Sequence, residues 1–139
     1  KNVRALSIAM GKAERLAQSE QFAELKSHLL HLLRHLRDME VYELTEAVRS
    51  ASEYKTEIND YLDLMALWFR DVLLFKATRQ IDGLAFAEEI NAISAQAQKS
   101  SYEGLERILK ALEKAKVRLN ANVNFELTME LLMLTIKEN

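Results

Sequence analysis

The residues best suited to metal chemistry in this 139-residue chain are three closely spaced histidines. His28, His31 and His35 follow Glu24 at steps of four, three and four, so all four lie along one line of a predicted helix. The i, i+4 pair of His31 and His35 puts two imidazoles on one face, where they can share a metal ion. No second segment supplies the Glu-x-x-His partner that di-metal helical bundles use. We therefore favour a solvated stripe and keep His28, His31 and His35 as metal-ligand candidates.

Arg70 and Asp71 stand side by side in the most apolar segment of the chain, residues 58–76. Because an unpaired buried charge is costly, we expect these side chains to form ion pairs or hydrogen bonds within the protein. No His, Ser or Lys stands at a diagnostic catalytic spacing beside them, so a catalytic or recognition role is the less favoured alternative. Trp68, in the same segment, is most simply an anchor of the core.

The segment 58–76 is also apolar on the side that a surface helix would expose. One helical face carries most of its large apolar residues, and Leu64, Leu67 and Leu74 lie on the opposite side. A helix of this kind is central in its fold or contacts a second partner. The last predicted helix has a similarly wide apolar arc, which includes Leu127, Leu131, Leu132 and Leu134. We expect these leucines to be structural or to contact other chains.

Positive charge gathers late in another predicted helix, at Lys110, Lys114, Lys116 and Arg118. There it complements the partial negative charge of a helix C-terminus. Interspersed glutamates dilute it, and the formal net charge of the chain is -2, whereas a dedicated nucleic-acid surface usually shows a basic excess. We therefore favour a solvated face, with DNA binding through residues 110–118 as an alternative.

No motif of an enzyme or of a cofactor site is present. The chain contains neither G-x-x-x-x-G-K-[ST] nor G-x-G-x-x-G, and the absence of cysteine excludes disulfides and thiolate metal ligands. We expect this part of the protein to have no catalytic site and no cofactor. No apolar run approaches the ~18 residues that a membrane span needs, and the lack of cysteine fits a reducing cytoplasm.

The elements that position these residues are expected to be helices throughout. The chain is 49% hydrophobic, contains no proline and shows no alternating β-branched run, which predicts an all-α bundle of about six or seven helices. Ser19 and Asp38 are predicted to start the second and third helices, and Asn122 or Asn124 the last one. Residues 100–103 have the capping-box form S-x-x-E, which predicts a further helix start.

Three motifs occur in the order and at the spacing of one known family. Residues 67–74 read LWFRDVLL and resemble the W-[YF]-R-D-[LV]-L segment in the C-terminal region of bacterial DNA polymerase III delta-prime subunits. Residues 118–134 are similar to the closing pattern of that family, which begins R-L-x-x-N-V-N-x-x-L. Residues 10–17 resemble its G-[KR]-A-L-x-L-A signature near the end of the small lid domain.

The resemblance implies that residues 1–18 are the end of a AAA+ lid domain or a linker helix, and residues 19–139 a C-terminal helical collar domain. In that family the collar domains of five subunits pack into a ring that holds the AAA+ modules. ATP-driven rearrangement of these modules opens the sliding clamp and loads it onto primed DNA. The chain begins with Lys-Asn rather than Met, as expected of a fragment of such a subunit.

The resemblance also implies partners and a location. The partners would be the collar domains of the gamma/tau and delta subunits, and DNA would be reached only through the complete complex, in the cytoplasm and away from membranes. The parent chain would be a non-catalytic subunit of the DNA-directed DNA polymerase holoenzyme, a nucleotidyltransferase complex.

Two alternatives remain open from the sequence. One is the collar domain of the gamma/tau ATPase subunit, whose longer chain would carry a Walker A loop upstream. The other comes from a different class: a stand-alone helical regulator that binds a ligand or metal through the stripe from His28 to His35.

Overall fold

The computed structural model describes the backbone of residues 2–139 and the side chains of residues 19–139. Over this range the predicted all-α bundle is confirmed, with six α-helices and no strand. The helices are α1 (Asn2–His35), α2 (Val41–Ala51), α3 (Ile58–Thr78), α4 (Ile90–Lys99), α5 (Tyr102–Asn120) and α6 (Phe125–Glu138). Three short 3-10 helices connect them: η1 (Leu36–Asp38), η2 (Ser52–Glu57) and η3 (Ala87–Glu89). None of the helices in the described range is long and apolar enough to cross a membrane.

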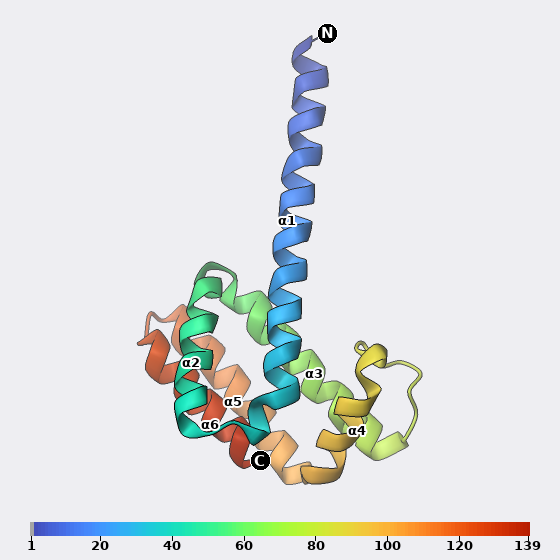
Figure 1. Cartoon of the computed structure of the whole chain (residues 1–139), viewed down its shortest axis with the longest axis vertical. Helices are drawn as coiled ribbons and strands as arrows, with labels where there is room; N and C mark the ends of the chain where they lie inside the picture. Colours follow the sequence, from blue (N-terminus) through green and yellow to red (C-terminus); the bar gives the residue numbers. More distant parts are fainter. Residues whose placement is uncertain (1) are drawn as a thin grey trace.

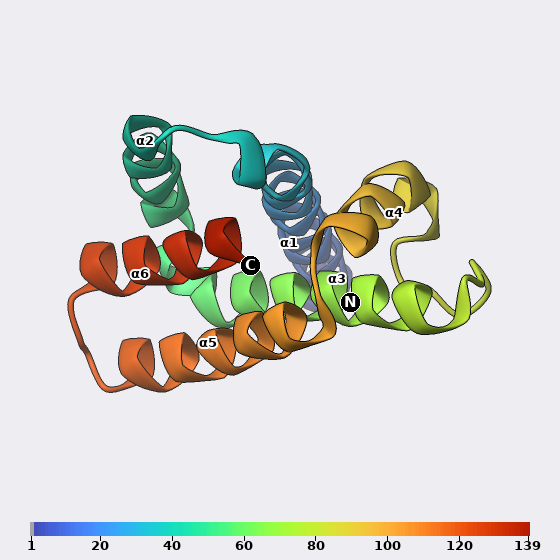
Figure 2. The ribbon, with the colours of Figure 1, turned by 90° about the horizontal axis from the view of Figure 1, so that it is seen from below.

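Helix α3 is the centre of the bundle. It packs against α1, α4 and α5, and α6 closes the bundle by packing against α5 and α2 (Figure 2). The C-terminal end of α1 lies in the bundle, whereas its N-terminal part projects away from it (Figure 1). The helices therefore share one core, which is built around α3.

The core consists mainly of the apolar faces that periodicity predicts, but Phe22 of α1 and Val41 of α2, which the same spacing places on these faces, are 47% and 64% exposed. Trp68, Phe69 and Met65 of α3 are at most 1% exposed, and they meet side chains from the other helices. Complete burial of a side chain of this size stabilises the fold by about 1.5–3 kcal/mol relative to exposure. The largest fully buried side chains are Trp68, Tyr61, Phe69, Leu29, Leu36, Leu62, Met65, Ile93, Leu105, Ile108, Met129 and Met133.

Two predicted helix starts near the N-terminus are wrong. No helix begins at Ser19, because α1 continues through it without a break and no proline or glycine stands there to interrupt the turn. Asp38 lies in η1, and α2 is instead capped by Glu40. The backbone N–H of Glu40 donates to the Glu43 carboxylate at 3.1 Å, and the Glu40 side chain accepts from the backbone N–H of Glu43 in return. Reciprocal bonds of this kind satisfy the free N–H groups of a first turn.

The two later starts are capped by single side chains. The α5 cap is Ser101, whose hydroxyl accepts from the Gly104 backbone N–H at 2.9 Å, so the prediction that the box begins at Ser100 is wrong by one residue. Ser100 is buried instead and accepts from Arg37 and Gln96. The start of α6 at Asn124 is confirmed, since its side chain accepts from the Leu127 backbone at 2.9 Å.

Asn122 ends the preceding helix. Its φ of 60° places it in the left-handed region, which asparagine tolerates better than most residues. The backbone N–H of Asn122 donates to the carbonyl of Leu119, and that of Val123 donates to the carbonyl of Arg118. These two bonds form a Schellman motif, which satisfies the last carbonyls of α5. The asparagine-rich segment thus stops one helix and caps the next.

Thr128 offers a test of how the core is packed. Among the described side chains, its hydroxyl is buried without a hydrogen-bond partner. A Thr128→Val substitution removes this unsatisfied group at almost equal volume, so we expect the free energy of unfolding to rise by about 1 kcal/mol. Urea denaturation measures the change. The control is Thr135→Val, because the Thr135 hydroxyl already donates to the Leu131 carbonyl at 2.9 Å; equal effects of the two substitutions would contradict the prediction.

Candidate protein interaction surface

Asp71 fixes the connection between α3 and α4. The residue is 4% exposed, and its two carboxylate oxygens accept from the backbone N–H groups of Ala85 and Phe86 at 3.1 and 2.7 Å. The Phe86 ring packs on Trp68, with the ring centroids 5.7 Å apart. Asp71 and Trp68 together hold the α3–α4 connection against the core.

Arg70 does not pair with its neighbour. Consecutive helical positions point about 100° apart, and Arg70 is exposed whereas Asp71 is buried. The ion pair that joins α3 to α5 uses other residues: the Lys116 ammonium lies 2.6 Å from a carboxylate oxygen of Asp63. Of the two charged residues in the middle of α3, Asp71 is a buried hydrogen-bond acceptor and Arg70 is a solvated cation.

The three histidines also differ in exposure, since His28 is half-buried whereas His31 and His35 are exposed. His31 and His35 are exposed on α1 with ring centroids 4.8 Å apart. His28 instead packs against Tyr54 and Tyr61, with the Tyr61 hydroxyl 3.5 Å from its Nδ1. Over the residues whose side chains are described, no group of three or more His, Cys, Asp or Glu side chains converges as a metal site.

Glu24 is exposed on α1 one helical turn before His28. It lines a cleft of about 480 Å³ between α1, η2 and the start of α3, together with Glu53, Glu57 and Asp60. Phe22 and Tyr54 supply the apolar part of the same cleft. The sequence did not predict this acidic cleft, because its carboxylates come from three separate elements.

The leucines on the outer side of α3 differ in exposure. Leu64 is half-buried, while Leu67 and Leu74 are 36% and 42% exposed. Leu64 and Leu67 line a groove of about 490 Å³ between α3 and α5. Its charged rim contains Asp63, Arg70, Glu113 and Lys116.

The leucines of α6 are divided between core and surface. Leu132 is buried and Leu134 half-buried, so both contribute to packing. Leu127 and Leu131 are 55% and 48% exposed on the outer side of the helix. A second apolar surface thus lies on α6, and α5 separates it from the groove on α3 (Figure 2).

Residues 19–138 match the family described as "DNA polymerase III, delta subunit, C terminal". The chain belongs to this family. It is also similar to a Bacillus subtilis (strain 168) protein named DNA polymerase III subunit delta', with 26% identity over 132 residues. The alignment covers 93% of this chain and 40% of that relative, so the chain spans less than half of the relative's length. No solved structure matches the chain.

These comparisons confirm the predicted resemblance to the C-terminal domain of delta-prime subunits, in preference to the gamma/tau alternative. Within this DNA polymerase III domain, the motif that includes Trp68 and Asp71 has a structural role in the core. The motif at residues 10–17 lies outside the described side chains, and the predicted division of the chain at residue 18 stays a prediction.

The role of Asp71 in this delta-type domain is testable by Asp71→Asn. The change removes a charge that accepts two backbone hydrogen bonds and brings an amide donor toward one of the two N–H groups. Bonds to a charged acceptor contribute about 1.5–3 kcal/mol, so we expect a loss of about 2 kcal/mol in the free energy of unfolding. Denaturant titration measures it. Asp63→Asn, at an exposed ion pair, is the control with an expected loss below about 1 kcal/mol, and a similar loss for both would count against this role.

His28 predicts an acid-dependent loss of stability. Its burial lowers the pKa from the ordinary value of 6.5 and His31 also lowers it, whereas the negative charge of Glu53 raises it. The unfolded chain therefore binds a proton at a higher pH than the folded chain, and stability falls as the pH drops through 6.5. We expect the melting temperature of His28→Gln to fall less than that of the unmodified domain between about pH 7 and pH 5. His35→Gln, at an exposed histidine two turns further along α1, is the control. Parallel curves for His28→Gln and the parent would rule this out.

Proposed function

We propose that this chain is the domain through which a delta-prime-type subunit joins the clamp loader of DNA polymerase III. In this role it packs beside the C-terminal domains of the gamma/tau and delta subunits, in the cytoplasm. The assembled ring then holds the AAA+ modules during ATP-driven loading of the sliding clamp onto primed DNA. The domain itself contributes contacts between subunits, and catalysis and cofactor binding belong to other parts of the complex.

The observation that carries this proposal is the exposure of leucines on two separate helices. Leu67 and Leu74 on α3 and Leu127 and Leu131 on α6 are each at least 36% exposed. Leu67 and Leu74 stand seven residues apart on one face of α3, and Leu127 and Leu131 stand four apart on one face of α6. Each pair therefore extends the apolar arc of its helix beyond the part that the core uses. Exposed apolar surface of this kind is typical of protein interfaces.

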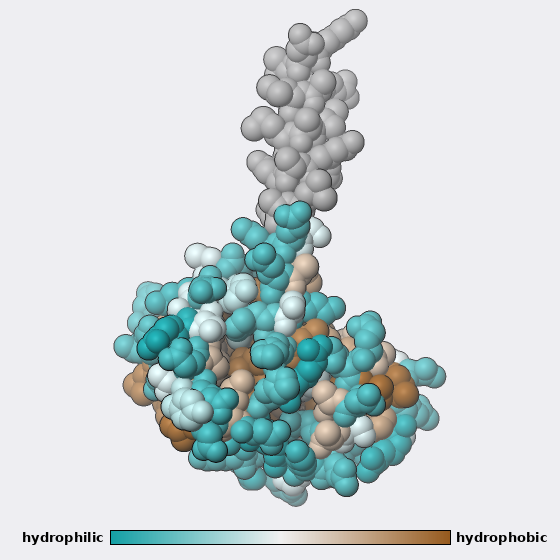
Figure 3. Space-filling view, in the orientation of Figure 1, coloured by the Kyte–Doolittle hydropathy of each residue, from teal (hydrophilic) through white to brown (hydrophobic). Residues whose placement is uncertain are grey.

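The arrangement of the two surfaces supports a position between two neighbours. The α3 groove and the outer face of α6 lie on different sides of α5. By contrast, the face that carries α1 and α2 is predominantly hydrophilic, with small and separate apolar patches (Figure 3). A subunit of a ring contacts one neighbour on each side through two different surfaces. Membership of the DNA polymerase III family supports other subunits of that polymerase as the two neighbours.

The test places charge on each proposed surface in the full-length subunit. Leu67→Glu and Leu127→Glu bury an unpaired carboxylate if these leucines lie in an interface, so we expect each to weaken assembly with the other loader subunits by at least about tenfold. Size-exclusion chromatography with multi-angle light scattering measures the assembled fraction.

Tyr42→Glu on α2 is the matched control, because Tyr42 is an apolar side chain that is 71% exposed away from both surfaces. Circular dichroism checks that all three variants keep their helices. If folded Leu67→Glu and Leu127→Glu subunits assemble as well as Tyr42→Glu, the proposed function is wrong.

A further inference from the structure

A groove of about 410 Å³ between α5 and α6 combines an apolar floor with a cationic wall. Ala111 and Ala115 of α5 and Leu132 of α6 lie at its base, and all three are buried or half-buried. Leu131 is 48% exposed and forms the wall on α6. The opposite wall consists of Arg107, Lys110, Lys114 and Arg118.

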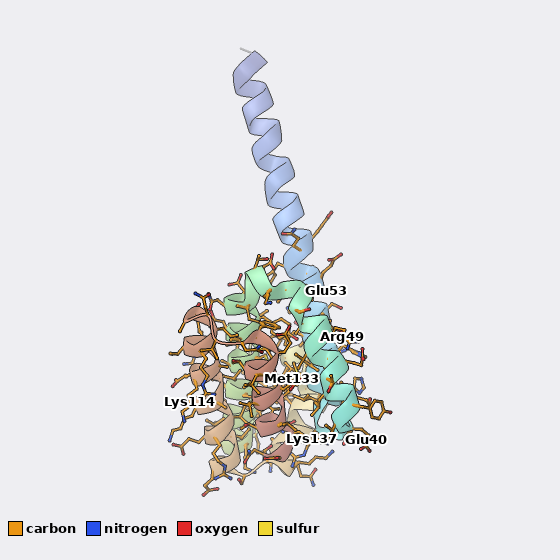
Figure 4. The ribbon with its side chains drawn as sticks, turned by 90° about the vertical axis from the view of Figure 1, so that its left-hand side faces the viewer. Glu40, Arg49, Glu53, Lys114, Met133 and Lys137 are labelled. Atoms are coloured by element: carbon orange, nitrogen blue, oxygen red, sulfur yellow. The ribbon has the colours of Figure 1, made fainter. Side chains whose placement is uncertain are left out.

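The four cations follow one line along α5. Their spacing of three, four and four residues repeats the helical turn, so they extend over about 16 Å at 1.5 Å per residue. No carboxylate lines this groove within the described residues. Figure 4 shows Lys114 on the outer side of α5, across α6 from α2. The wall therefore presents one sign of charge over about three helical turns.

Two of these cations remain available to a partner. Lys110 pairs with Glu106 at 3.0 Å, and Arg107 donates to the Asn139 side chain at 2.9 Å. Lys114 and Arg118 are both exposed, and neither takes part in the ion pairs found among the described residues. Their charge is compensated only by solvent in the isolated domain.

The groove on the other side of α5 differs in charge. Its rim contains two acids, Asp63 and Glu113, beside the cations Arg70 and Lys116, and Asp63 pairs with Lys116. That surface is neutral overall and selects a partner mainly by its apolar shape. The α5–α6 groove has the same type of apolar base with uncompensated positive charge, so its electrostatic preference has a definite sign.

We propose that the α5–α6 groove binds an amphipathic helix that carries carboxylates along one edge. The apolar base and Leu131 receive the apolar face of that helix, and Lys114 and Arg118 face its carboxylates. A groove between two packed helices accepts a third helix of similar length, which fits the three turns covered by the cations. The inference rests on the proposed assembly function, for which it specifies the chemistry of one partner.

The apolar base distinguishes this site from a nucleic-acid surface. Phosphate backbones are bound by cations and hydrogen-bond donors, and they gain nothing from Leu131 and the alanines beneath it. The domain as a whole has a net charge of -2, which opposes long-range attraction of DNA. A protein helix uses both the apolar and the charged parts of the groove.

Direct binding to the 139-residue chain tests the inference. The probe is a fluorescent synthetic helix of about 18 residues, with leucines at positions i, i+4, i+7 and i+11 and glutamates along one edge. Fluorescence anisotropy measures its affinity against two comparison peptides, in which the glutamates are replaced by lysine or the leucines by serine. We expect only the probe to bind, with an affinity that falls as salt is raised.

Variants of the domain locate the site. Lys114→Gln with Arg118→Gln is expected to weaken probe binding roughly three- to thirtyfold, and Leu131→Gln roughly five- to tenfold. Arg49→Gln with Lys99→Gln removes the same charge from α2 and α4 and is expected to leave the affinity within about twofold. Circular dichroism checks the fold of each variant.

With the peptides and variants, any of three results would overturn the inference: no binding of the probe, equal binding of the lysine peptide, or equal loss in the Arg49/Lys99 control. Binding of a 20-base-pair DNA duplex of about equal strength to the probe, and lost in the same Lys114/Arg118 variant, would also overturn it in favour of DNA. The subunit-assembly measurement with Leu67→Glu is independent of the peptide. If assembly depends on Leu67 but the probe does not bind, the proposed function stands and only the groove inference fails.

Discussion

The burial of α3 is the constraint on which the rest of the domain depends. This 21-residue helix is apolar over most of its circumference, and it is stable in water only if other helices cover it. Helices α1, α4 and α5 supply that cover, and each brings a stripe of apolar residues at helical spacing. The remaining exposed arc, at Leu67 and Leu74, is the part of α3 that these three helices leave uncovered.

Asp71 shows how a polar group can strengthen an apolar core. Its carboxylate accepts two backbone N–H groups from the α3–α4 connection, so the chain leaves α3 and returns beside it in a defined position. Phe86 is thereby held against Trp68, and α4 begins shortly after η3. The buried charge is compensated by these hydrogen bonds, which is the condition for a carboxylate to remain inside a protein.

Helix α5 organises the surface. It is amphipathic, with Leu105, Ile108 and Leu112 in the core and its cations outside. Because α3 and α6 pack on its two sides, it forms one wall of each of two grooves. The grooves share the type of apolar base but differ in charge. This difference in charge gives the two sides of α5 different electrostatic character.

The sequence by itself determined the helical class, the apolar stripes and the start of α6 at Asn124. These features depend on local spacing and on backbone hydrogen bonds between residues close in the chain. It predicted Ser19, Asp38 and Ser100 as helix caps, since each has a suitable side chain. At Ser19 and Asp38 the backbone continues or turns differently, and Ser100 is buried in a hydrogen-bond cluster with the distant Arg37.

Only the tertiary structure decided which leucines are buried and which are exposed. Leu131 and Leu132 are neighbours of the same type, and one is 48% exposed whereas the other is 2% exposed. Likewise, Lys116 is paired with Asp63 from another helix, but Lys114 lines the open groove. Spacing along a helix fixes the direction of a side chain relative to its own axis. The surroundings of that side chain depend on which helices pack beside its own helix. The packing of the helices is in turn decided by how the apolar faces of all of them are buried together.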